Sequence, residues 1–395
     1  MTTNSTSSLR RFAKSALLVS AAFPISALIA DSANAEQTVE VSAAETAASV
    51  QAKIDAAKAA PDRDITITVT SKGEVTGPGT IGLAPAAGQG DGKIVFGNAG
   101  SIGDVDKAGA VTDIVGVALG GSSAKADNKL TATNSGLITG GFSANGFGGT
   151  VSLDNSGTIH NGINIQGPGN LALTSSGAIR SGDVLLQSVA SVTSTTAGDT
   201  TTEVYKSGEV SAAFGDVGSA DGKVKGDATF IAQVGNVNIE AKGTAGDLVG
   251  YSGGSTVTVV NTSSAPVASK SVVTSEGSLV YEAGTVKIDT AATSKLDSVT
   301  GVANGTVDIA VAGSVEGAVN ATPAYNTNAA NKTVVTRDSK DTVDLVRVDT
   351  YSSAAVTGDS TISVAVTGAV GGAANAQATR DASIVNAGEV KGALN

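Results

Sequence analysis

Short segments that alternate apolar and polar residues recur along most of the chain. Val151 and Leu153 are separated by one polar residue, and Leu171 and Leu173 repeat this spacing further along. Side chains alternate between the two faces of a β-strand, so a period of two predicts short strands with one apolar face and one polar face. We therefore expect strands over most of residues 64–395.

A glycine follows each strand-like segment, and after it come a variable residue, a branched apolar residue and commonly a second glycine. Clear copies are ITITVTSKGEVTG (65–77), IVFGNAGSIG (94–103), LTATNSGLITG (130–140), VSLDNSGTIHNG (151–162), LALTSSGAIRSG (171–182), VDIAVAGSVEG (307–317), ISVAVTGAVG (362–371) and IVNAGEVKG (384–392). Weaker copies lie at 204–210, 237–245 and 272–279. The central glycines are Gly73, Gly100, Gly136, Gly157, Gly177, Gly208, Gly243, Gly277, Gly313, Gly368 and Gly388.

The spacing of these central glycines has a minimum near 20 residues, with longer and irregular intervals between some copies. One turn of a solenoid with variable loop insertions gives this kind of spacing. The longest interval, between Gly313 and Gly368, indicates a degenerate turn hidden inside it. Asn and Gly before the second strand tolerate positive φ, so each copy is expected to be a strand, a sharp corner and another strand.

A single copy cannot bury its apolar face, whereas turns stacked about 4.8 Å apart pair every backbone group and continue the apolar column. The sequence therefore predicts an all-β fold, a right-handed parallel β-helix or solenoid of roughly a dozen turns. Aromatic residues are 3% of the chain and Trp is absent, while Gly reaches 50 residues. This composition favours a thin core of small and β-branched side chains.

Residues 42–60 break the alternation and are predicted to be helical. Ser42 and Glu45 form a capping-box signature at the start, and Pro61 ends the run. Its apolar residues share one face: Ala47, Val50, Ile54 and Ala57. We expect a helical cap over 36–63, because an open solenoid end exposes unpaired strand groups. A processed pro-segment or a flexible spacer is the alternative.

The first 35 residues have the features of a secretory signal peptide. A basic start at Arg10, Arg11 and Lys14 precedes an apolar stretch, and Ala33-Asn34-Ala35 before Glu36 provides an A-x-A cleavage site. General secretion is the expected route, with twin-arginine export as the alternative. No later stretch holds 18 consecutive apolar residues, so no transmembrane helix is expected.

The charge and the absence of cysteine exclude several classes of function. Without residues 1–35, which hold three basic residues and one acidic residue, the formal charge changes from −11 to 22 minus 35, which is −13. So acidic a chain repels nucleic acid. With no Cys, disulfide scaffolds, thiol catalysis and thiolate metal sites are excluded.

Candidate chemistry is sparse. His160, the single histidine, lies in the variable slot after Ile159 and is expected to be a solvated surface residue. A catalytic triad or a metal site would need companions for it that the sequence lacks. The carboxylate pairs that could serve glycoside hydrolysis have no aromatic platform nearby; they are Asp104 with Asp106 and Asp341 with Asp344. We expect no catalytic residue, no cofactor and no dedicated metal site, and at most weak calcium binding at GQGDG (88–92).

Two stretches rich in Thr, Ser, Ala, Asn and Asp, 191–202 and 323–341, are predicted to be loops that project from the coil. Recognition usually resides in such loops.

The signal peptide, the missing cysteines and the copies NAGSIGD, NSGLITGG, NSGTIHNG, SSGAIRSG and NAGEVKG resemble the passenger region of autotransporter proteins of Gram-negative bacteria. The resemblance covers most of 64–395 and implies a β-helical stalk at the cell surface or outside the cell, active in adhesion, aggregation or biofilm formation. Such proteins normally end in a membrane β-barrel, which would lie beyond residue 395 or be supplied by a separate outer-membrane translocator.

Our first hypothesis is accordingly a non-enzymatic surface adhesin or stalk whose host or matrix ligand the sequence does not identify. A self-associating surface-layer or fibre subunit is the second hypothesis. A polysaccharide-active β-helix enzyme is the third.

Overall fold

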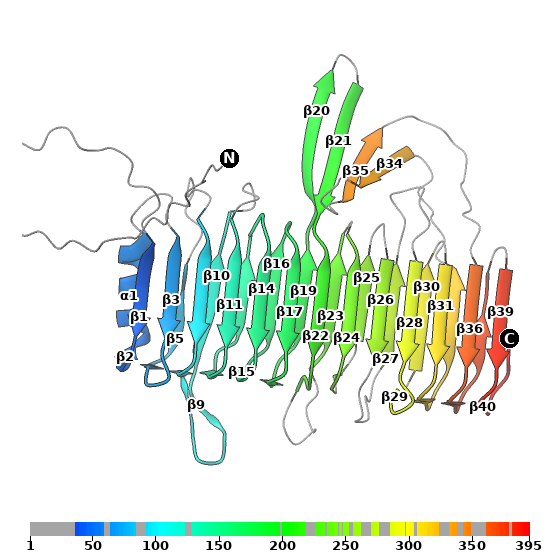
Figure 1. The fold of residues 1–395 in the computed structure, drawn as a ribbon, viewed down its shortest axis with the longest axis horizontal. Coiled ribbons are helices and arrows are strands. Elements are labelled where there is room, and N and C mark those ends of the chain that lie inside the picture. Colours follow the sequence, from blue (N-terminus) through cyan, green and yellow to red (C-terminus); the bar gives the residue numbers. More distant parts are fainter. Residues whose placement is uncertain are drawn as a thin grey trace, which may run out of the picture. The chain divides into compact units, whose positions relative to one another are not determined.

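A computed structural model describes residues 36–58, 64–83, 92–122, 128–197, 200–218, 226–233, 235–243, 245–246, 248–252, 256–261, 270–275, 285–296, 298–303, 306–323, 332–337, 343–348, 361–378 and 381–395. The chain separates into two units, 1–35 and 36–395, and all described residues belong to the second. This unit is mostly β, and its described part contains one helix (Figure 1). The predicted predominance of strands is therefore confirmed.

The strands fall mainly into long parallel sheets, which we name A, B and C. Sheet A has 13 strands, which in spatial order are β1 (Gln37–Val41), β3 (Ile65–Val69), β6 (Ile94–Asn98), β11 (Leu130–Asn134), β14 (Val151–Asn155), β17 (Leu171–Ser175), β22 (Val210–Phe214), β24 (Val237–Ala241), β26 (Thr256–Asn261), β28 (Thr285–Thr290), β31 (Thr306–Val311), β36 (Thr361–Val366) and β39 (Asp381–Asn386).

Sheet C has 11 strands: β5 (Gly79–Leu83), β10 (Val115–Gly120), β13 (Phe142–Asn145), β16 (Ile163–Gly167), β19 (Val184–Ser188), β23 (Ala228–Ala232), β25 (Leu248–Ser252), β27 (Lys270–Ser275), β30 (Ser298–Ala303), β33 (Val319–Pro323) and β38 (Ala374–Ala376). Sheet B is made of shorter strands: β2 (Ala44–Thr46), β4 (Glu74–Thr76), β7 (Ser101–Ile102), β12 (Leu137–Ile138), β15 (Thr158–His160) and β18 (Ala178–Arg180). A separate four-stranded sheet contains β29 (Lys295–Leu296), β32 (Ser314–Val315), β37 (Ala369–Val370) and β40 (Glu389–Val390).

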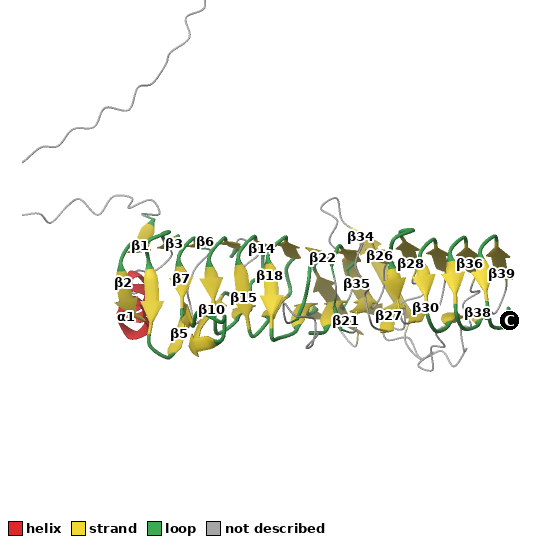
Figure 2. Ribbon diagram, turned by 90° about the horizontal axis from the view of Figure 1, so that it is seen from below, coloured by secondary structure: helices red, strands yellow, loops and turns green. Residues whose placement is uncertain are grey.

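The chain visits these sheets in a fixed order. It runs through β14, β15 and β16 in sheets A, B and C, and then through β17, β18 and β19, each of which pairs in parallel with its counterpart one round earlier. We call one such round a turn. Figure 2 shows successive turns lying side by side. The strands β31 and β36 pair directly, so the long interval between Gly313 and Gly368 hides no extra sheet A strand, contrary to the sequence prediction.

Helix α1 (Ala47–Lys58) takes the place of the sheet C strand in the first turn, between β2 and β3. The predicted capping box is wrong. The side chain of Thr46 caps the helix by accepting a hydrogen bond from the backbone N–H of Ser49 at 3.2 Å, and Ser42 lies before β2. The four residues of its predicted apolar face are all buried, namely Ala47, Val50, Ile54 and Ala57. Strands β1 and β2 already belong to sheets A and B, so regular pairing starts within the range predicted as a cap.

The helix also satisfies the edge of sheet C. The edge strand β5 has no strand before it, and the side-chain amide of Gln51 replaces one. It donates to the carbonyl of Gly82 at 2.9 Å and accepts from the N–H of the same residue at 2.8 Å. This reciprocal pair closes backbone groups that would otherwise be open to another strand.

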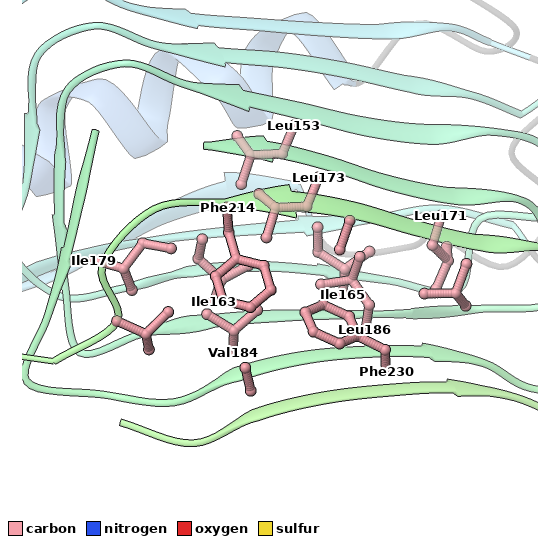
Figure 3. Packing of buried hydrophobic residues seen from close by; sticks show 14 of the residues in the cluster. Leu153, Ile163, Ile165, Leu171, Leu173, Ile179, Val184, Leu186, Phe214 and Phe230 are labelled. Atoms are coloured by element: carbon pink, nitrogen blue, oxygen red, sulfur yellow. The ribbon is translucent and has the colours of Figure 1, made fainter. Parts of the chain in front are cut away.

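The core is a set of columns that run through the turns. Ile163 stacks on Val184, and Ile165 stacks on Leu186 and then Phe230, as the close-up in Figure 3 shows. Phenylalanine contributes more to this core than the sequence analysis predicted. Five of the chain's seven are described, and all five are fully buried: Phe96, Phe142, Phe147, Phe214 and Phe230.

Small neighbours make room for these rings. Phe96 faces Ala132 across the strand pair, and Phe230 faces Gly250. The small residue on the neighbouring turn leaves space for each ring. The core can therefore hold phenylalanine and remain closely packed.

A buried amide ladder runs along the corner between sheets A and B. The Nδ2 of Asn98 donates to Oδ1 of Asn134 at 2.8 Å. Asn134 donates in the same way to Asn155 at 2.7 Å, and Asn155 donates to the hydroxyl of Ser175 at 3.0 Å. Phe214 occupies the next position and ends the ladder. The Asn of the repeat therefore satisfies polar groups inside the corner, where an unpaired amide would be costly.

The central glycines allow close approach between turns, and positive φ is not their role. Gly73, Gly100, Gly136, Gly157 and Gly177 all lack positive φ. A Cβ on any of the last four would overlap the carbonyl oxygen of the preceding glycine in this column. Positive φ occurs instead at the corner between sheets B and C, at Gly77, Gly103, Gly141, Asn161, Gly162 and Ser181.

Most of the later central glycines lie in the same kind of column, but Gly208 does not. Gly243 continues the column through Gly215, which the sequence analysis missed, and the later members of the same kind are Gly313, Gly368 and Gly388. Gly208 lies instead against Gly169, at the corner between sheets C and A. Gly277 is outside the described residues.

Two glycines of one turn provide a matched test of this packing. Gly100→Ala should lower the free energy of unfolding by roughly 2–3 kcal/mol, because its methyl group has no space beside the Gly73 carbonyl. At Gly97 an added Cβ would lie 3.6 Å from Thr133 Oγ1, an ordinary contact, so Gly97→Ala should change stability by less than about 1 kcal/mol. Urea unfolding of both variants is the measurement, and equal losses would contradict the close-approach role.

Candidate functional site

A four-stranded antiparallel sheet stands apart from sheets A, B and C, and we call it the projecting sheet. Its strands, in order, are β20 (Ser191–Ala197), β21 (Thr200–Ser207), β35 (Val343–Val348) and β34 (Lys332–Arg337). Figure 1 shows β20 and β21 extending away from the stacked turns. The two predicted loops are thus corrected: 191–197 and 332–337 are strands.

Two insertions from distant parts of the sequence build this sheet. The first leaves between β19 and β22, and the second leaves between β33 and β36. Both therefore replace a corner between sheets C and A. The central pair β21 and β35 joins them with Val204 opposite Val346 and Tyr205 opposite Leu345. Since β22 and β36 lie five strand spacings apart in sheet A, the projecting sheet links turns separated by roughly 24 Å.

This pairing could not be read from either segment alone. Both are rich in Thr and Val, residues that favour strands, but their partner strands lie far away in the sequence. A strand signal was present in VDLVRV (343–348), where three of the six residues are the β-branched Val. This composition favours a strand without identifying its partner.

His160 differs from its prediction. It is 6% exposed, on β15, and its neighbour on the adjacent strand β18 is Arg180. Burial lowers the pKa of His160, and the positive charge of Arg180 lowers it further. The Nε of Arg180 is buried and has no hydrogen-bond partner in the described structure. The variable slot is therefore buried at His160, and the prediction of a solvated surface residue is wrong.

The carboxylates considered for catalysis have local structural roles or lie apart. Asp106 accepts hydrogen bonds from the N–H groups of Ala108 and Ala110, at 2.9 and 2.8 Å, within the hairpin of β8 (Asp104–Val105) and β9 (Val111–Asp113). Asp344 lies in the projecting sheet, and Asp341 is outside the described residues. GQGDG also lies almost entirely outside them.

The described residues form neither a metal site nor a membrane-spanning helix. None of the described His, Asp and Glu residues gather in groups of three or more that could hold a metal ion. No helix in the described part is long and apolar enough to cross a membrane. No family model, no curated protein and no solved structure matches this chain.

The lone histidine gives a clean pH test. Its lowered pKa in the folded state means that the unfolded chain, with a His pKa near 6.5, takes up the proton first as pH falls. Stability should be fully present above about pH 7 and should fall as pH drops through and below about 6.5. His160→Gln should remove this part of the pH dependence. Because the chain has one histidine, its proton resonance can be titrated directly by NMR.

Arg180→Gln serves as the partner variant. Loss of the positive charge should raise the pKa of His160 toward its ordinary value, while burial keeps it below that value. A His160 resonance that titrates at or above 6.5 in the unmodified chain would contradict this account.

Proposed function

We propose that this chain is an exported, right-handed parallel β-solenoid that serves as a surface stalk or adhesin, in the manner of an autotransporter passenger. Right-handed crossover is the strong rule for parallel strands within one sheet, and the order of sheets A, B and C repeats through the turns. Residues 1–35 act as the export signal in this proposal, and an outer-membrane translocator, beyond residue 395 or separate, is the partner.

The projecting sheet carries this proposal. A corner between sheets C and A needs little chain: β16 ends at Gly167 and β17 begins at Leu171. The two insertions are much longer, and they pair with each other instead of with sheets A, B or C. The stacked turns do not need these two insertions. Because the insertions form an ordered sheet outside the stack, they are well placed to contact another surface.

Deletion of the projecting sheet tests the proposal. Residues 189–209 and 324–360 would each be replaced by the short corner Pro-Gly-Asn that occurs at 168–170. The double deletion should reduce attachment to bacterial cells or matrix-coated surfaces at least tenfold, with the β-type circular dichroism kept, because the stacked turns do not depend on it. Adhesion would be measured with purified chain at matched concentrations.

The control shortens a different projecting segment, the tip of the β8–β9 hairpin at 106–110, to Asn-Gly. This variant should attach as well as the intact chain. If the double deletion attaches equally well, the projecting sheet is not the contact surface and the adhesin proposal loses its support.

A further inference from the structure

The outer face of sheet C holds a groove that the proposed function does not use. Two adjoining hollows, with volumes of about 600 and 320 Å³, share Thr80, Ala118 and Ser143 in their walls. Together they cross strands β5, β10, β13, β16 and β19, from Gln51 of helix α1 to Leu185. The groove therefore runs across the strands, along the direction in which the turns stack.

Small residues on the outside of the first strands create this hollow. Gly82 and Thr80 of β5 lie beside Ala118 and Gly116 of β10, so little side chain covers the backbone there. The corners between sheets B and C form one side, where Asn161 has a φ of 57° and its Nδ2 donates to the Thr139 carbonyl at 3.0 Å. That hydrogen bond holds the Asn161 side chain in place at the side of the groove.

The groove presents uncharged hydrogen-bonding groups. Thr80, Asn145 and Asn164 line it and are exposed. The side chains of Thr80 and Asn145 form no hydrogen bond within the described part of the chain, and Asn164 only accepts one, from Gln166 at 2.9 Å. Asn145 and Gln166 are register partners on neighbouring strands, about 4.8 Å apart. A side-chain amide both donates and accepts, as a hydroxyl group does.

The charge of the groove excludes most other ligands. Among the described residues that line the groove, Asp183 is the one ionisable residue, and its Oδ1 already accepts a hydrogen bond from the N–H of Asp227 at 2.9 Å. The described part of the lining holds no Lys or Arg side chain that would attract nucleic acid or an acidic glycan. A peptide would bind a sheet by adding a strand to its edge. Strands β10, β13, β16 and β19 are paired on both sides, so that mode is closed here.

We propose that this groove binds a strand of neutral polysaccharide, laid along the stack with its hydroxyl groups hydrogen-bonded to Thr80, Asn145 and Asn164. The inference is independent of the projecting sheet. In this proposal the stacked turns have a binding surface separate from the projecting sheet, and successive sugar residues contact successive strands of sheet C.

Affinity electrophoresis of the full chain tests the proposal, in gels that contain a soluble neutral glucan, mannan or galactan, with polygalacturonate as the anionic comparison. At least one neutral polymer should retard the chain, and polygalacturonate should not. The double variant Asn145→Ala/Asn164→Ala should weaken the association constant at least tenfold. Ala118→Leu, which fills the floor of the groove, should weaken it similarly.

Thr131→Ala/Thr133→Ala is the matched control, because both threonines are exposed on the outer face of sheet A. It should bind like the unmodified chain, and so should the chain without the projecting sheet, which separates this proposal from the adhesin proposal. Retardation by none of the neutral polymers, retardation by polygalacturonate alone, or unchanged binding by both groove variants would overturn it.

Discussion

The structure depends on backbone pairing between successive turns. Each interior strand of sheets A, B and C hydrogen-bonds to its counterpart one turn earlier and one turn later, in parallel register. The spacing between turns is therefore fixed near 4.8 Å. Every side chain that faces inward must stack at that distance on the equivalent side chain of the next turn. The composition of the core follows from this constraint.

The constraint is most severe at the corner between sheets A and B. There the backbones of neighbouring turns come so close that a Cβ has no space, and glycine is the residue that fits. Two residues earlier, Asn side chains replace apolar ones and hydrogen-bond from turn to turn. Each such buried bond adds about 1 kcal/mol net. Because each of these side chains hydrogen-bonds to the equivalent position of the next turn, they favour the correct register over a slipped one.

The outer surface is under no such constraint, and functional variety can arise there. The projecting sheet leaves the stack through two corners and links turns that otherwise meet only their neighbours. The groove on sheet C arises from outward-facing positions, where Gly, Ala, Thr and Asn change no core contact. His160 shows that the variable slot is not uniformly solvated, because this side chain is buried and the Nε of its neighbour Arg180 is buried as well.

The sequence by itself determined the strands, the apolar face of the helix and the recurring corners, because each is set by residues close together in the chain. Alternation at Val151 and Leu153, and the shared face of Val50 and Ile54, are local patterns that folding preserves. Tertiary structure decided what depends on the neighbouring turn or on a distant segment. That Gly100 serves close approach, that His160 is buried and that 202–207 pairs with 343–348 are facts about contacts between residues far apart in sequence. No local pattern encodes the partner of such a contact, since partner choice is settled only when the turns stack.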